Sequence, residues 1–340
     1  MKDMNNTKLI DGNLVENIKK IIYNSRKNVL QKINHQLILA YWEIGKEIIS
    51  NETKNEANKQ TSRQVILSLS KQLTAEIGKG FSRSNLFNMR KLYQEYSDVQ
   101  TLSGHLSWSH ICELLIIENK EKRKFYEIET INSLWSIREL KRQIDSSLYE
   151  RLLLSSGKNN KQKILDLAKN GLEISKAEDI LRNPYVFEFL GIPENKPIYE
   201  RDLEQKLIRH IEEFLLELGK GFMFVGSQQR ITINNTHYYV DMVFYNKILK
   251  SYILIELKTT KLNIADAGQL NTYLNYYKTE VNDENDNPPI GIILCAEKDE
   301  ITAEYILGGF ENNVFASKYT TILPDKKQLI DEVENAMNAQ

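Results

Sequence analysis

The stretch that decides the fold runs from residue 236 to residue 261 and reads THYYVDMVFYNKILKSYILIELKTTK. It holds two apolar runs, each short enough to be a β-strand, separated by the short segment from Asn246 to Lys250. Two strand-like runs joined by so short a loop predict a β-hairpin. Three charged residues interrupt the hydrocarbon of these strands: Asp241, Glu256 and Lys258.

The geometry of a hairpin brings these three side chains together. Glu256 and Lys258 are two residues apart and therefore project from the same face of the sheet. A turn centred near Ile248 places Asp241 across from Ile255 or Glu256, and directly paired side chains lie about 5 Å apart. The hairpin is therefore expected to gather two carboxylates and an ammonium group in one small volume.

A cluster of this kind has two interpretations. Buried charges are costly unless they are compensated, and Lys258 can neutralise only one of the two carboxylates. A divalent ion such as Mg²⁺ suits oxygen ligands and commonly takes one or two carboxylates together with phosphate and water. The alternative is a structural ion pair with one acid at the strand edge. Spacing alone leaves both alternatives open.

The order Asp241, about fifteen residues, then Glu256-Leu257-Lys258 resembles the PD-(D/E)XK nuclease superfamily. A preceding helix at 199–222, a strand pair at 224–246 and the segment AGQLNTYLNYY at 267–277 extend the likeness. Together they look like the C-terminal domain of the bacterial YhcG-type family. The resemblance implies an α/β nuclease core with a mixed sheet flanked by helices, in the order α-β-β-β-α-β.

The resemblance also implies roles for the clustered residues. Asp241 and Glu256 are expected to bind a divalent metal, Mg²⁺ or Mn²⁺, with the backbone carbonyl of Leu257 as a third ligand. Lys258 is expected to activate water or to hold a phosphate.

The same resemblance implies roles for further residues. Glu204 matches the acid of the superfamily's first motif, although it lies in an acid-rich helix whose charges mostly form a solvated face. Gln269 matches a frequent position on the following helix, and it could equally cap a backbone group. Gln228 is a candidate DNA contact. The chain departs from the family at Ser227, where a basic residue is frequent, and at Gln229, which occupies a polar or aromatic position.

The first half of the chain is predicted to be helical. Apolar residues recur every three or four positions from Leu14 to Ile48, and a polar stretch from Asn51 to Gln60 follows. A second helix is expected to end at Gly78, a plausible C-cap, and Ser82 can N-cap a third. Helix, glycine-bearing turn and basic helix is the layout of a helix-turn-helix.

The third helix carries candidate DNA-binding side chains, because Arg and Asn read base edges and Lys or Ser grips phosphate. With the preceding turn, the candidates are Lys79, Ser82, Arg83, Asn85, Asn88, Arg90 and Lys91. A solvated helix face is the alternative, and the residues alone do not decide between the two. The segments YWEIGKEI (41–48), GKGFSRSNLFNMRKLY (78–93) and LSWSHICELL (106–115) resemble the N-terminal domain of the same family. That resemblance implies a winged-helix-like, DNA-binding domain.

The chain thus divides into three predicted parts. Residues 1–154 form an all-α, helix-turn-helix-like domain, 155–198 a linker and docking segment, and 199–340 the nuclease domain. The overall fold class is α+β. After the hairpin we expect a helix at 264–280, a strand at 290–297, a helix at 299–308, a strand near 319–323 and a final helix at 325–337.

Composition fits a globular enzyme without naming one. The net charge of the 340 residues is −1, which combines +5 for residues 1–150 with −6 for residues 151–340. Two cysteines far apart, Cys112 and Cys295, support neither a disulfide framework nor a zinc cluster. No apolar run reaches the roughly 20 residues of a transmembrane helix, and the N-terminus lacks the apolar core of a signal peptide. We therefore expect a cytoplasmic protein without membrane partners, and the lack of a Gly-rich phosphate loop predicts no nucleotide cofactor.

The sequence therefore predicts a metal-dependent nuclease, a DNA endonuclease guided by its N-terminal domain. Double-strand cutting in the superfamily usually takes two active sites, so the resemblance implies a homodimer. Two alternatives stay open. One is a catalytically silent DNA-binding or regulatory partner that uses the nuclease fold, and the other is a nuclease directed at RNA.

Overall fold

The computed structural model describes residues 12–54, 62–99, 102, 104–155, 160–193, 197–310 and 313–338. The predicted polar segments 51–60 and 155–162 fall partly outside these ranges. The chain forms two compact units. The first comprises Met1–Arg123 and Thr130–Ile137, and the second comprises Lys124–Glu129 and Arg138–Gln340.

The first unit is helical, as predicted. Its helices are α1 (Gly12–Lys54), α2 (Ser62–Glu76), α3 (Arg83–Glu95) and α4 (Trp108–Ile116), and α5 (Lys120–Ser133) contributes to both units. No strand occurs within the described residues of this unit, so the all-α prediction is confirmed there. These residues therefore include no β-hairpin of the kind that forms the wing of a winged helix.

Helices α1, α2 and α3 share a small core of Ile48, Ile66, Leu86 and Met89. The predicted start of α3 is confirmed. The backbone N–H of Asn85 donates to the Ser82 hydroxyl at 3.3 Å, which makes Ser82 the N-cap.

The second unit is built on a six-stranded mixed sheet with the order β1-β6-β5-β4-β3-β2. Strands β2, β3 and β4 are antiparallel, whereas β4, β5, β6 and β1 run parallel. The strands are β1 (Tyr185–Val186), β2 (Phe222–Ile233), β3 (Thr236–Asn246), β4 (Ser251–Lys261), β5 (Ile290–Glu297) and β6 (Asn313–Thr320). The predicted hairpin is therefore confirmed as β3 and β4.

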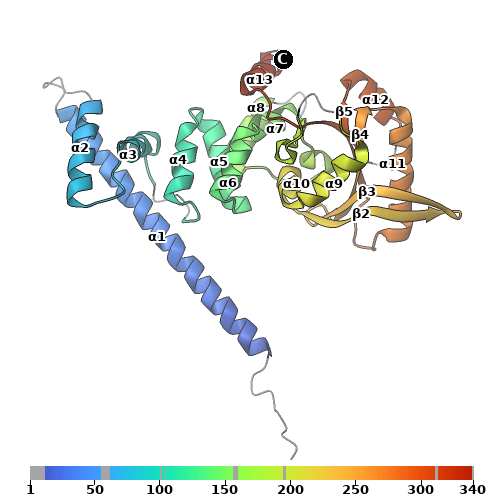
Figure 1. The fold of residues 1–340 in the computed structure, drawn as a ribbon, viewed down its shortest axis with the longest axis horizontal. Helices are drawn as coiled ribbons and strands as arrows, with labels where there is room; N and C mark the ends of the chain where they lie inside the picture. The colour runs from blue at the N-terminus through green and yellow to red at the C-terminus, as the bar shows by residue number, and fades with distance from the viewer. Residues whose placement is uncertain are drawn as a thin grey trace, which may run out of the picture. The chain divides into compact units, whose positions relative to one another are not determined.

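Helices cover both faces of this sheet (Figure 1). One face packs against α9 (Glu200–Arg209) and α10 (Ile211–Leu218), and the other against α11 (Ile264–Tyr276) and α12 (Glu300–Leu307). The alternation of the strands produces the two cores: Met242 and Ile255 face the first, and Val243 and Leu254 face the second. The remaining helices of the unit are α6 (Ile137–Asp145), α7 (Leu148–Leu154), α8 (Asn160–Asn170) and α13 (Lys326–Asn338).

Helix α11 lies close to β5 because residue 291 is glycine. A Cβ at Gly291 would lie 2.7 Å from a methyl carbon of Leu270, well inside van der Waals contact. The close approach seats α11 against the sheet, and Asp266 in its first turn lies 4.0 Å from Lys258 of β4.

Two predicted boundaries were wrong. The helix predicted at 199–222 is two helices, because the chain bends at His210 so that α9 packs on β4 and α10 on β2. The strand predicted near 319–323 begins at Asn313, because Val314 and Ala316 already alternate into the core.

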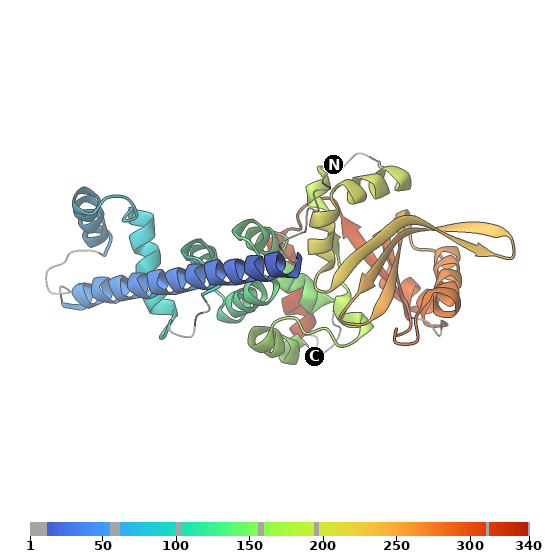
Figure 2. The ribbon, with the colours of Figure 1, turned by 90° about the horizontal axis from the view of Figure 1, so that it is seen from below.

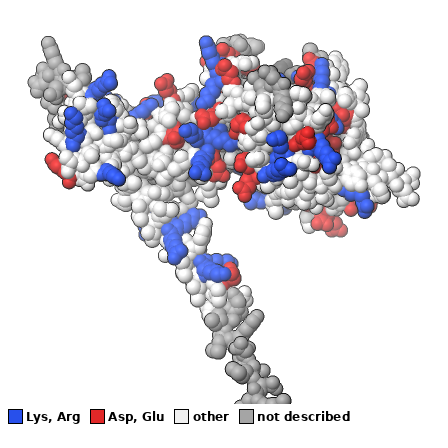
Figure 3. Space-filling model, in the orientation of Figure 1, with Lys and Arg blue, Asp and Glu red and all other residues white. Residues whose placement is uncertain are grey.

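Beyond the core, the β2–β3 hairpin extends past the rest of the sheet (Figure 2). Its tip, residues 231–239, reads ITINNTHYY and lacks acidic residues, lysine and arginine, in contrast to the mixed charges over much of the unit (Figure 3). Among the described helices, none is long and apolar enough to cross a bilayer.

Candidate active site

The site lies where β3 and β4 separate. Their ladder ends with the pair Met242 and Ile255, so the next residues, Asp241 and Glu256, lie opposite each other. Beyond this pair, backbone N–H groups donate to the side-chain carboxylates of the opposite strand instead of to its backbone carbonyls. The backbone N–H of Leu257 donates to Asp241 Oδ2 at 2.9 Å, and the N–H of Asp241 donates to Glu256 Oε1 at 3.3 Å. The expected juxtaposition of the two acids is thus present in the structure.

The hydrogen bond from Leu257 also orients its carbonyl. In an extended strand, the N–H and C=O of one residue point to the same side. Because the Leu257 N–H points toward Asp241, its carbonyl faces the same gap between the strands. This is the orientation that a third oxygen ligand between Asp241 and Glu256 requires.

Glu204 joins this cluster from α9, and Gln228 on β2 connects it to Asp241. The Gln228 amide donates to Glu204 Oε2 at 2.8 Å and to Asp241 Oδ1 at 3.2 Å. Gln228 adopts a left-handed backbone conformation with φ of 47°. The sequence made Gln228 a candidate DNA contact. In the structure its side-chain amide bridges the carboxylates of Glu204 and Asp241.

Lys258 lies on the same strand but faces other acids. Its Nζ is 3.7 Å from Glu200 Oε2 and 4.0 Å from Asp266 Oδ1. Glu200 also accepts the backbone N–H of Thr259 at 3.3 Å. Lys258 is therefore held between the N-terminal turns of α9 and α11. It lies two residues after Glu256 on β4.

Gln269 on α11 reaches the cluster from the side. Its amide donates to Glu256 Oε2 at 3.4 Å and to the Tyr273 hydroxyl at 2.8 Å. Tyr273 is buried, and burial raises the pKa of its hydroxyl. Gln269 thus lies on the helix that follows the hairpin, beside Glu256.

At the paired acids, burial outweighs the nearby positive charge of Lys258. Burial, reinforced by the charge of Asp241, raises the pKa of Glu256 to about 8. Burial also raises the pKa of Asp241. Burial and the charge of Asp241 raise the pKa of Glu204. Three neighbouring acids that all resist ionisation form a site that favours a cation.

The donor set fits a hard divalent cation. Within the described residues, no group of three or more His, Cys, Asp or Glu side chains is arranged to hold a metal by itself. A site of two carboxylates and one carbonyl remains suitable for Mg²⁺, which keeps several waters and takes few protein ligands. The raised pKa values of Asp241 and Glu256 agree with this, because a bound cation would supply the missing positive charge.

Sequence reasoning missed Glu200 and Asp266, the two acids beside Lys258. Glu200 lies four residues before Glu204, so both project from one side of α9, and this spacing could have identified it. Asp266 forms a capping box with Asn263 at the start of α11, with hydrogen bonds of 3.1 and 3.2 Å. The Asn-x-x-Asp spacing before a helix was a readable signal.

The predicted DNA-binding residues of the first unit fall into two groups. Lys79, Ser82 and Arg83 are exposed, and Lys91 is half-buried. Three others are half-buried and hold partners inside the unit. Asn85 bonds Gly80 and Trp108, Asn88 bonds Cys112, and Arg90 pairs with both carboxylate oxygens of Glu52.

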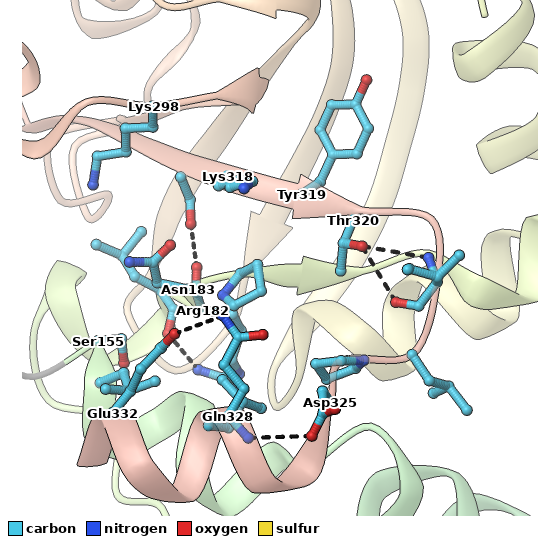
Figure 4. A pocket seen from close by; sticks show the side chains of 18 of the residues that line it. Ser155, Arg182, Asn183, Lys298, Lys318, Tyr319, Thr320, Asp325, Gln328 and Glu332 are labelled. Atoms are coloured by element: carbon cyan, nitrogen blue, oxygen red, sulfur yellow. Dashed lines mark hydrogen bonds between the residues drawn. The ribbon is translucent and has the colours of Figure 1, made fainter. Parts of the chain in front are cut away.

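A cavity of 1070 Å³ lies elsewhere in the second unit, beside β6 (Figure 4). Lys298 and Lys318 line one side, and Gln328 and Glu332 of α13 line the other. None of the predicted catalytic residues lines it. The acid cluster is therefore separate from this cavity.

A mixed sheet with Asp241 on one strand and Glu256-Leu257-Lys258 on the next, flanked by helices on both faces, defines a nuclease-type domain of the PD-(D/E)XK class. Comparison with known proteins agrees. Residues 178–334 match the family described as "YhcG PDDEXK nuclease domain", and residues 17–151 match the "DUF1016 N-terminal domain".

The chain belongs to the YhcG family. It is 36% identical over 350 residues to "Putative nuclease YhcG" of Escherichia coli (strain K12), over 94% of this chain and 92% of that protein. Two solved structures are more distant, each with 15% identity. They are a repair endonuclease from Pyrococcus abyssi (TM-score 0.25, 37% of this chain) and EndoMS in apo form (TM-score 0.26, 38%). Each match spans 49% of the other chain, and the family assignment rests on the sequence matches.

Proposed function

We propose that this protein is a metal-dependent DNA endonuclease whose catalytic centre comprises Asp241, Glu256 and Lys258. The observation that carries the proposal is the interlocked pair of acids at the end of the β3–β4 ladder, where each carboxylate accepts a backbone N–H from the opposite strand. The nuclease-domain match supports the reaction class.

In this proposal Asp241, Glu256 and the Leu257 carbonyl hold Mg²⁺ or Mn²⁺. When bound, such an ion supplies positive charge beside the phosphate and makes water a stronger nucleophile at neutral pH. The chain's own contribution is to fix the ligands. The backbone bonds to the two carboxylates hold their oxygens, and Gln228 and Gln269 donate to them from the sides.

Lys258 supplies the positive charge of the chain at this site. Its ammonium has three donors and can orient the attacking water or bind a phosphate oxygen. Glu200 and Asp266 hold it in place. Glu204, linked to Asp241 through Gln228, supports the metal site from α9.

We propose that the N-terminal unit delivers DNA to this centre through the exposed side chains of Lys79, Ser82 and Arg83, with Lys91 beside them. About half of the predicted linker, 155–177, lies between the two family matches, which end at 151 and begin at 178, and the rest lies within the second match. The compact units instead divide between 123 and 138. A homodimer with two catalytic centres, working in the cytoplasm, completes the proposal.

The proposal is tested by incubating purified protein with supercoiled plasmid, a branched DNA and a single-stranded RNA. Each substrate is tested with Mg²⁺, with Mn²⁺ and with EDTA. Metal-dependent cutting of DNA that is lost in Asp241→Asn and in Lys258→Ala is the expected result.

Other outcomes separate the alternatives. Binding of DNA without cutting under any metal condition would favour the catalytically silent partner, and cutting of RNA alone would change the substrate class. Cutting that persists in Asp241→Asn would reject the assignment of the site.

A further inference from the structure

Exposed apolar side chains occur near the starts of α9 and α11, the two helices whose acids contact Lys258. Among the described residues, the three most exposed large apolar side chains are Tyr305 at 86%, Tyr199 at 80% and Ile264 at 73%. All three belong to the second unit. We call these two tyrosines and the isoleucine the aromatic rim.

Tyr199 lies directly before α9. The next residue is Glu200, whose carboxylate is 3.7 Å from the Lys258 ammonium. Consecutive Cα atoms are 3.8 Å apart, so the Tyr199 backbone lies within one residue of a group that contacts Lys258. The ring lies in solvent at the α9 side of the site.

Ile264 and Tyr305 lie at the α11 side. They line an open groove of 780 Å³ between the start of α11 and α12, together with Leu262, Ala265 and Ile306. Its lining includes Ala265, the residue before Asp266, which is the second acid beside Lys258. The aromatic rim therefore flanks Lys258 from two helices.

The chemistry of the rim fits one kind of ligand beside a phosphodiester. Tyrosine rings do not bind phosphate by charge, but they offer flat faces on which nucleobases stack. In an intact duplex, both faces of each base are already covered by neighbouring bases. Only unpaired or unstacked bases can reach a ring at the protein surface.

We propose that the aromatic rim binds unstacked nucleobases next to the phosphate that is cut, so that the preferred substrate is single-stranded or branched at that point. Tyr199 stacks on a base on one side of the phosphate, and Tyr305 with Ile264 receives a base on the other side. This inference rests on the proposed nuclease function, because it takes the Lys258 site as the place where the phosphate lies.

The test measures DNA binding without cleavage, in the Asp241→Asn background. Fluorescence anisotropy compares three labelled DNAs of equal length: a single strand, a fork with unpaired arms, and an intact duplex. We expect Tyr199→Ala and Tyr305→Ala each to weaken binding of the single strand and the fork about tenfold, and of the duplex less than twofold.

Matched variants identify stacking as the cause. Tyr199→Phe and Tyr305→Phe keep the ring and should bind as the parent does. Leu165→Ala removes another exposed apolar side chain, 59% exposed on α8, and should change nothing. 2-Aminopurine in the unpaired arm should be quenched by the parent and less quenched by the alanine variants.

Two results would overturn the proposal. Unchanged binding of the single strand and fork would leave the rim as a surface for another macromolecule, such as a protein partner. Equal loss for duplex and single strand would show that the rings act without regard to base stacking. Because binding is measured without cleavage, loss of the nuclease proposal and loss of this one are distinguishable.

Discussion

Two glutamates in the second unit are almost equally buried, but their pKa values shift in opposite directions. Glu217 on α10 is 1% exposed and Glu256 on β4 is 2% exposed. Glu217 pairs with Arg151 and Arg142, whereas the charge that acts most strongly on Glu256 is that of another acid, Asp241. The difference separates a structural ion network from a candidate functional site.

Around Glu217 every oxygen has a strong donor. Arg151 donates to both oxygens, Arg142 donates at 3.2 Å, and the backbone N–H of Val186 donates at 2.9 Å. Burial alone would raise the pKa of this carboxyl, but the two guanidinium groups outweigh it and lower the pKa. The network ties α6 and α7 to α10 and β1.

Around Glu256 the donors are a backbone N–H and the Gln269 amide, and its pKa rises to about 8. A buried acid with a raised pKa and few donors marks position 256 as a candidate functional position.

The largest expected effect is on catalysis. Asp241→Asn removes one carboxylate charge while keeping the acceptor oxygen for Leu257, so folding should be retained. We expect the plasmid-cutting rate to fall by about 1000-fold or more, as for loss of a main electrostatic group. Asp202→Asn, at an exposed position on α9, is the matched control and should cut normally. A cutting rate for Asp241→Asn within tenfold of the parent would contradict the assignment.

Neutralising each buried glutamate tests whether Glu217 stabilises the fold and Glu256 does not. Glu217→Gln leaves the buried Arg151 without its anion, while Arg142 keeps Glu188 at 2.8 Å, and should lower the free energy of unfolding by about 3–5 kcal/mol. Glu256→Gln relieves repulsion with Asp241 and should leave the metal-free protein as stable or more stable at pH 8. Urea unfolding in EDTA measures both. Equal destabilisation by the two variants would remove the distinction.

The pH dependence follows from the raised pKa of Glu256. The folded state keeps the proton on Glu256 between about pH 4.5 and 8, while the unfolded state releases it. The free energy of unfolding should therefore fall as pH rises through this window, by at most about 1.4 kcal/mol per pH unit from this group. Melting in EDTA from pH 5 to 8 should show a smaller slope for Glu256→Gln. An identical slope in that variant would show that Glu256 ionises normally.

The smallest effects are expected in the first unit, where the same contrast recurs between two arginines. Arg83 is exposed, whereas Arg90 is paired with Glu52 at 2.9 Å. Arg83→Ala should leave stability within about 0.5 kcal/mol and lower the salt slope of DNA binding by about 0.9. Arg90→Ala should instead lower the melting temperature. An unchanged salt slope for Arg83→Ala would exclude that residue from a DNA interface.

The hairpin was predictable because its information is local. The short loop and the alternation of apolar residues set the register, and the register places Asp241 beside Glu256 without reference to the rest of the chain. The Ser82 cap was readable for the same reason.

Contacts that depend on tertiary packing could not be predicted in this way. The pairing of Lys258 with Glu200 depends on how α9 packs against β4. The inward direction of Asn88 and Arg90 depends on which side of α3 meets α1 and α4. The break at His210 likewise reflects two packing surfaces, β4 and β2, that one straight helix could not cover.

The most direct test of the central claim, that the acids at the end of the β3–β4 ladder hold a divalent ion, is calorimetric titration of the protein with Mg²⁺ at pH 7. Titrations in buffers of different ionisation enthalpy would count the protons released. Because the pKa of Glu256 is about 8, most of this group is protonated at pH 7, and metal binding should release close to one proton. We predict binding with proton release in the parent protein and loss of binding in Asp241→Asn. Binding that survives in Asp241→Asn, or the absence of binding in the parent, would contradict the claim.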